Sequence, residues 1–118
     1  LFTKRGIEIE GTALRSKRHR DGEEMEVDLL GVNRKQVVVV EVKTTLKPRD
    51  VDDHLTRLAR FKEFFPEYAD REVIGAVAGM HIEAGADRYA YKNGLFVLGQ
   101  SGETVRILND EKFRPRIW

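Results

Sequence analysis

Three ionisable residues near the middle of the chain have the types and spacing of a catalytic cluster. Glu41 follows Asp28 after thirteen residues, and Lys43 comes two residues later. Carboxylate oxygens are the ligands that Mg²⁺ or Mn²⁺ prefers, and the chain has no cysteine and three histidines, which disfavours zinc. A lysine beside such a pair could orient a water molecule or stabilise negative charge on a phosphate.

The position of these residues depends on two strands that we expect to form a hairpin. The strands are predicted at Met25–Gly31 and Gln36–Thr44, with a short turn between them. If the hairpin is centred between positions 34 and 35, residues whose numbers sum to 69 lie opposite each other. Asp28 then faces Glu41, and Glu26 faces Lys43. A one-residue slip would place the two carboxylates on opposite faces.

Four consecutive valines, Val37–Val40, precede the second carboxylate. Such a run is typical of a strand that is buried on both faces. Because side chains alternate along a strand, Glu41 and Lys43 share a face with Val37 and Val39. Either the strand emerges into water at this point and the charges are simply solvated, or the two residues belong to one functional site.

The remaining pattern predicts a single α/β domain over residues 1–118, with a mixed sheet flanked by helices. A strand is expected at Gly6–Leu14 and a tight turn at Asp21-Gly22. A helix with Asp50 as N-cap is expected to continue to Phe65. Further elements are expected as follows: strand Val73–Ala78, helix Ala84–Lys92 with a left-handed cap at Asn93-Gly94, strand Leu95–Leu98 and strand Glu103–Leu108.

A block of positive charge precedes the predicted turn at Asp21-Gly22, and a block of acidic residues follows it. The block includes Lys17, Arg18, His19 and Arg20. Because this segment is expected to be a flexible loop without a helix that could read bases, its side chains are predicted to contact phosphates of DNA. The alternative is a solvated hairpin tip whose charges balance those of the neighbouring acids.

The combination of Asp28, Glu41-Val42-Lys43, a valine-rich strand, an amphipathic helix and a further apolar strand resembles the PD-(D/E)XK nuclease superfamily. The superfamily includes restriction endonucleases, Holliday junction resolvases and repair exonucleases, and the stretch from Glu26 to Lys43 is also similar to small prokaryotic endonuclease-like proteins. The resemblance implies a restriction-endonuclease-like core, whose first helix would lie before Leu1. Val27 replaces the proline that gives the motif its name.

The resemblance also implies an activity and roles for individual residues. Asp28, Glu41 and the backbone carbonyl of Val42 would bind Mg²⁺ or Mn²⁺, and Lys43 would position the attacking water. The implied reaction is hydrolysis of DNA phosphodiester bonds, by an endonuclease or a resolvase-like enzyme. The alternatives are a silent module that binds nucleic acid and a module for protein interaction or dimerisation.

Two further residues are candidates for a supporting role. His54, on the helix after Lys43, either contacts a phosphate or a metal-bound water, or lies at the edge of the apolar stripe. Glu26 either tunes Lys43 as a neighbouring acid or makes an ordinary cross-strand ion pair.

The composition sets broader limits on the protein. No apolar run is long enough to span a membrane and no signal peptide is recognisable, so a cytoplasmic location and no membrane partner are expected. A homodimer remains open. The chain begins with leucine, and we expect it to be the C-terminal part of a longer protein.

Overall fold

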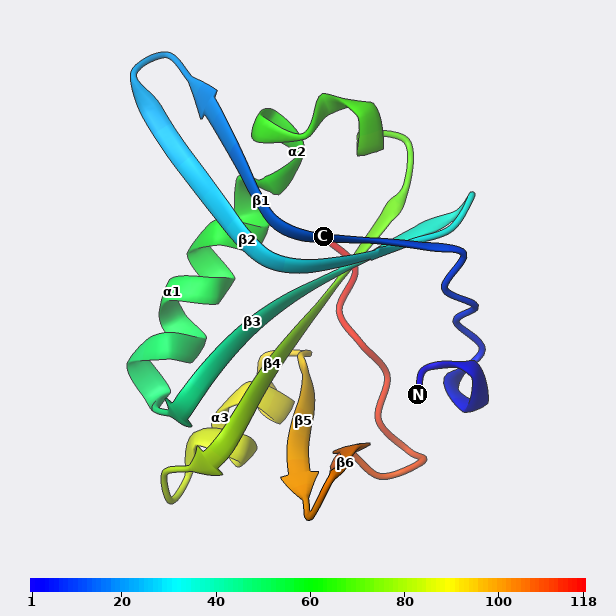
Figure 1. Ribbon diagram of the computed structural model, residues 1–118, viewed down its shortest axis with the longest axis vertical. Helices are drawn as coiled ribbons and strands as arrows, with labels where there is room; N and C mark the ends of the chain where they lie inside the picture. Colours follow the sequence, from blue (N-terminus) through cyan, green and yellow to red (C-terminus); the bar gives the residue numbers. More distant parts are fainter.

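In the computed structural model, which describes all 118 residues, six strands form one mixed sheet in the order in which they occur along the chain (Figure 1). The strands are β1 (Gly11–Arg20), β2 (Glu23–Val32), β3 (Gln36–Leu46), β4 (Glu72–Ile82), β5 (Phe96–Ser101) and β6 (Thr104–Ile107). Strands β3, β4 and β5 are parallel to one another, and the other neighbouring pairs are antiparallel. This arrangement is the restriction-endonuclease-like α/β core that the sequence predicted.

Helices cover one face of the sheet. They are α1 (Pro48–Ala59), α2 (Phe61–Phe64) and α3 (Ala86–Lys92), and a short 3-10 turn, η2 (Pro66–Tyr68), follows α2. A second 3-10 turn, η1 (Thr3–Arg5), belongs to the N-terminal segment. Parallel strands require a crossover connection, and α1 and α3 lie in the connections β3–β4 and β4–β5. The opposite face is covered by the two terminal segments, through Phe2, Ile7 and Phe113. No helix is long and apolar enough to cross a membrane.

The valine run in β3 is buried on both faces, as its composition predicted. Val37 and Val39 pack with the helices, while Val38 and Val40 pack with the terminal segments. Each fully buried valine contributes roughly 1.5–3 kcal/mol through removal of apolar surface from water. The strand that carries Glu41 is therefore held rigidly along its first half.

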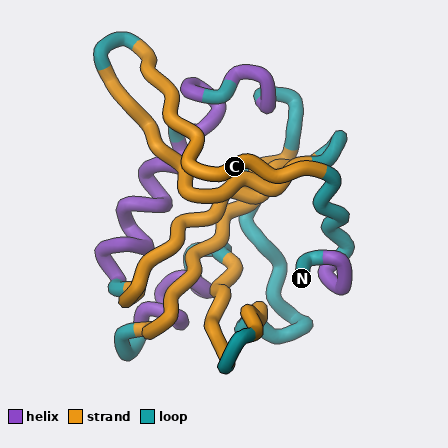
Figure 2. The backbone as a smooth tube through the Cα atoms, viewed as in Figure 1, coloured by secondary structure: helices purple, strands orange, loops and turns teal.

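Strands β2 and β3 pair along only part of their length and then separate. Their ladder runs from Val32↔Val37 to Leu29↔Val40 and then ends, whereas the β1–β2 ladder continues to Arg20↔Glu23. Residues 15–28 form a two-stranded projection, here called the hairpin arm (Figure 2). We call the point where β2 leaves β3 the fork.

The hairpin arm is attached to the helices by apolar and polar contacts. Met25 and Val27 belong to the same apolar cluster as the phenylalanines of α2. Arg18 donates two hydrogen bonds to the carboxylate of Glu67, at 3.0 and 2.7 Å, and its guanidinium lies 4.4 Å from the ring centre of Phe65. Beyond the fork, β2 no longer pairs with β3, and its apolar side chains belong to the cluster that includes α2.

Three sequence predictions about these elements were wrong. The first strand begins at Gly11 and includes the basic block. The Asp21-Gly22 turn has both φ angles positive (50° and 79°), and such a turn lets β1 and β2 pair up to their ends. The block is therefore an ordered strand and not a flexible loop. The predicted long helix is broken at Arg60 into α1 and α2. Asp50 lies inside α1, where its carboxylate accepts a hydrogen bond from the Lys47 amide at 2.9 Å.

A single asparagine organises the turn between β2 and β3. The side-chain oxygen of Asn33 accepts hydrogen bonds from the amides of Lys35 (2.8 Å) and Gln36 (2.7 Å). Its side-chain nitrogen donates to the carbonyl of Glu8 at 2.6 Å. These bonds fix the length and shape of the turn, and the turn sets the pairing of the two strands.

Candidate active site

The fork brings Asp28 and Glu41 together. The observed ladder has the predicted register, in which opposite residue numbers sum to 69, and the two acids occupy the next position after Leu29↔Val40. Asp28 accepts a hydrogen bond from the amide of Val42 at 2.8 Å. This bond replaces the ladder beyond the fork and holds one carboxylate directly beside the strand that carries the other.

The two acids and the lysine differ in their exposure to solvent. The side chain of Glu41 is nearly buried, that of Asp28 is half-buried, and that of Lys43 is exposed. Lys43 lies close enough for its charge to act on both acids, as a minor influence that favours their ionised forms. The three predicted catalytic residues therefore form one cluster, open to water on the side of Lys43.

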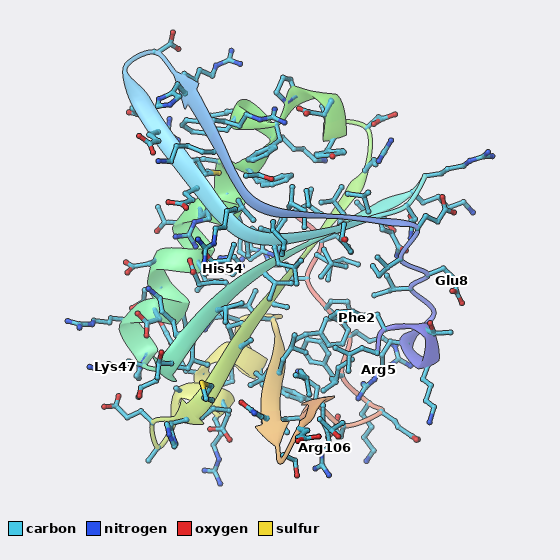
Figure 3. All side chains as sticks on the ribbon, viewed as in Figure 1. Phe2, Arg5, Glu8, Lys47, His54 and Arg106 are labelled. Carbon is cyan, nitrogen blue, oxygen red and sulfur yellow. The ribbon has the colours of Figure 1, made fainter.

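Behind Glu41, a chain of polar contacts leads into the protein core. The guanidinium of Arg57 on α1 forms an ion pair with Glu41 at 2.6 Å between Nη1 and Oε2. The same Nη1 lies 2.8 Å from Nδ1 of His54, whose Nε2 is 3.0 Å from the carbonyl oxygen of Val39. His54 is fully buried between α1 and the sheet (Figure 3).

The partners of His54 determine which ring nitrogen carries the proton. Arginine is always a donor, so Nδ1 of His54 must accept from Arg57. The carbonyl of Val39 is an acceptor, so Nε2 must carry the hydrogen. His54 is thus a neutral imidazole that orients Arg57, and Arg57 in turn orients Glu41. Its burial leaves no direct contact with a bound phosphate in this arrangement.

The two carboxyl groups have pKa values that move in opposite directions. Burial, followed by the hydrogen bond with Asp28, raises the pKa of Glu41 to about 7, although Arg57 opposes this shift. Partial burial also acts to raise the pKa of Asp28, but hydrogen bonds from Glu41 and the Val42 amide outweigh it, and its pKa is lowered. Below pH 7 a protonated Glu41 can therefore donate to an ionised Asp28, whereas above this pH Glu41 is ionised and pairs with Arg57.

The donor set fits a hard divalent cation that retains some of its water. Each carboxylate has one oxygen that is not committed to Val42 or Arg57. No group of three or more acidic, histidine or cysteine side chains converges anywhere in the structure. The site therefore supplies two carboxylates, and Mg²⁺ commonly keeps several waters in such a site.

The structure corrects the predicted environment of Glu26. Because β2 leaves β3 at the fork, Glu26 does not face Lys43, and it pairs across the arm with Lys17 instead. Arg57, which contacts Glu41 directly, was missed by the sequence analysis. The available signal was its position three residues after His54, a spacing that places two side chains on one face of a helix.

The basic residues of the hairpin arm are largely engaged within the protein. Lys17 forms an ion pair with Glu24 at 3.2 Å, and Arg18 is held by Glu67. Arg20 donates to the carbonyl of Glu63 at 2.9 Å, while His19 lies exposed, 3.9 Å from Glu24. Contacts between these four side chains and phosphate remain a prediction, and they would require some of the internal partners to be exchanged.

The titration of His54 gives a testable effect on stability. Burial, reinforced by Arg57, lowers the pKa of His54 to about 4 from 6.5. Between these values the folded protein binds fewer protons than the unfolded chain, so stability falls as the pH falls. We expect the stability difference between wild type and His54→Gln to fall by about 2 kcal/mol from pH 7.5 to pH 5.0, measured by urea unfolding. Glu41 is present in both proteins, so its opposite titration cancels. A stability difference independent of pH would contradict a His54 that stays neutral in the folded protein.

Comparison with known protein families gives one match that covers most of the chain. The model of a family described as a domain of unknown function, DUF8196, matches residues 1–107. The chain belongs to this family. No curated protein matches it significantly.

Solved structures show what this DUF8196 domain resembles. A repair endonuclease from Pyrococcus abyssi is 28% identical with a TM-score of 0.52, and the match covers 73% of this chain and 36% of that one. An EndoMS solved in complex with double-stranded DNA is 26% identical with a TM-score of 0.56, with 81% and 39% covered. The domain thus spans little more than a third of these proteins. Its fold is that of the PD-(D/E)XK nucleases, as the sequence motif indicated.

Proposed function

We propose that this domain hydrolyses DNA phosphodiester bonds with the help of Mg²⁺ or Mn²⁺. The observation that carries the proposal is the convergence of Asp28, Glu41 and Lys43 at the fork. The similar structures, a repair endonuclease and EndoMS bound to double-stranded DNA, support the choice of DNA as substrate.

The geometry suggests a role for each residue of the cluster in hydrolysis. Asp28, Glu41 and the carbonyl of Val42 would hold the cation, which supplies charge neutralisation at the phosphate and lowers the pKa of water. Lys43, exposed beside them, would orient the attacking water and stabilise the charge that develops on the phosphate oxygens. Hydrolysis forms a bond from the water oxygen to phosphorus and breaks one ester P–O bond, and the leaving oxygen takes up a proton.

Cleavage of a DNA panel tests this function directly. Linear, branched, mismatched and single-stranded substrates would be incubated with the protein and Mg²⁺ or Mn²⁺, with EDTA and the Glu41→Gln variant as controls. We expect cleavage of at least one substrate that both controls abolish. Binding of DNA without cleavage under every condition would instead support the silent nucleic-acid-binding module.

Metal binding can be measured separately from cleavage. Two carboxylates form an incomplete oxygen site, so we expect weak binding of Mn²⁺ that depends on Asp28. Titration calorimetry or Mn²⁺ relaxation should show loss of this binding in Asp28→Asn, while the control Asp87→Asn, an exposed change on α3, retains it. Equal binding by wild type and Asp28→Asn would remove the metal from the fork.

A further inference from the structure

A second candidate binding site lies far along the chain from the fork, between the end of α3 and the C-terminal segment. This pocket, here called the tail pocket, has a volume of about 330 Å³. Its lining includes four cationic side chains, Lys92, Lys112, Arg114 and Arg116, and no carboxylate. For a chain with a net charge of +1, this is a concentrated excess of positive charge.

The C-terminal segment that lines the pocket is held in place by specific contacts. Gly94 has a positive φ of 79°, and a Cβ added there would lie 2.4 Å from the Cβ of Arg116. The amide of Arg116 donates to the carbonyl of Gly94 at 3.0 Å, and the amide of Trp118 donates to Val73 at 2.9 Å. These contacts attach the C-terminal segment to α3 and to β4 (Figure 1). The cations on this segment are therefore held in place.

None of the four cations forms an ion pair, in contrast to those of the hairpin arm, although Lys112 lies close enough to Asp110 to contribute to the lowered pKa of that carboxyl. Neither lysine forms an ion pair, and the arginines interact only with neutral groups. Arg114 donates from Nη1 to the carbonyls of Glu111 (2.9 Å) and Phe113 (3.0 Å). The guanidinium of Arg116 lies 3.8 Å from the ring centre of Trp118. Both guanidinium groups are thus oriented, while their charge remains uncompensated.

Simple compensation of the helix dipole does not account for this cluster. The C-terminal end of α3 carries at most about half a negative charge, against four positive ones. Guanidinium groups bind phosphate oxygens in a fixed fork geometry, and lysines add mobile point charges. A phosphate group is the anion that suits two oriented arginines with two lysines.

We propose that the tail pocket binds a phosphate group of the nucleic-acid backbone, at a site separate from the catalytic cluster. The choice of nucleic acid as the source rests on the proposed function, whereas the affinity for phosphate does not. The contact carries no base readout, because a bond to a backbone phosphate is the same whatever the base attached to it. It would add affinity to any contribution of the hairpin arm, whose cations are mostly paired within the protein.

The decisive variant is Lys92→Gln/Lys112→Gln, because both lysines are exposed and neither packs within the fold. The matched control is Arg34→Gln/Lys35→Gln, which removes the same charge at the exposed β2–β3 turn. Equilibrium binding of a duplex would be measured in EDTA over a range of salt concentrations. We expect the tail-pocket variant to bind every sequence about tenfold more weakly, with the salt slope reduced by about 1–2, and the control to change less than twofold. Equal effects of the two variants would overturn the proposal.

A second measurement identifies the source of the phosphate. Inorganic phosphate should shift the amide resonances of Gly94 and Lys112 in wild type but not in the variant, and added duplex should prevent the shift by competition. Phosphate binding without competition by duplex would overturn the assignment to nucleic acid, and an absence of any shift would overturn the pocket as an anion site. Because these readouts need no cleavage, failure of the proposed nuclease activity would be seen separately.

Discussion

Replacement of Lys43 by alanine is expected to reduce DNA cleavage by about 10²–10³-fold under single-turnover conditions, with DNA affinity retained within a few fold. The lysine lies at the open side of the carboxylate pair, where charge would develop in the transition state. An interaction made mainly in the transition state appears in the rate and not in substrate binding. Folding should survive, because the side chain is exposed at the end of a sheet strand.

The control is Lys35→Ala, which removes the same exposed charge at the opposite end of the hairpin. It should leave the cleavage rate unchanged. Lys43→Ala could instead weaken DNA binding and lower the salt dependence of log K by about 1, while the cleavage rate at saturating protein stays unchanged. This result would make the lysine a phosphate contact only. Unchanged cleavage would remove the catalytic role of the whole cluster.

The second large effect concerns Arg57. The Arg57→Met variant leaves the nearly buried Glu41 without its counter-charge and His54 without its donor. Loss of one partner of a buried ion pair typically costs about 3 kcal/mol or more. We expect a destabilisation of that order at pH 8 with EDTA present, measured by urea unfolding.

The destabilisation should depend on pH and on Glu41. The pKa of Glu41 in the folded protein is about 7, so at pH 5 the group is protonated and needs no counter-charge. The cost of Arg57→Met should therefore be smaller at pH 5 than at pH 8. The double variant Arg57→Met/Glu41→Gln should recover much of the lost stability at pH 8, as a thermodynamic cycle would show. Equal costs at both pH values, or no recovery of stability in the double variant, would mean that Arg57 acts through packing or through its hydrogen bond to His54 and not through Glu41.

The core of the candidate site could be predicted because it depends on local periodicity. Alternation along β3 and the short turn were sufficient to pair Asp28 with Glu41, and the four valines identified the buried strand. These features follow from the two-residue repeat of strands and need no knowledge of the rest of the fold.

The path of the hairpin arm and the surroundings of the catalytic cluster could not be predicted, because they depend on contacts between segments that are distant in the sequence. Beyond the fork, β2 separates from β3 and its Met25 and Val27 join the apolar cluster that includes α2, and this separation moves Glu26 away from Lys43. The basic block was expected to be free, but Arg18 bonds to Glu67, which is 49 residues away in the sequence. The role of Arg57 required the position of α1 over the sheet.

The turn organised by Asn33 has a consequence for insertions and deletions. None of its residues belongs to the catalytic cluster, yet the number of residues in it determines which residue of β2 meets Glu41. One added or deleted residue would change the pairing by one and turn Asp28 to the opposite face of the sheet, without altering any catalytic side chain. Substitutions of the exposed Arg34 and Lys35 are thus tolerable where a change in the length of the turn is not. A library of length variants at positions 33–35 would reveal this as loss of activity in folded proteins.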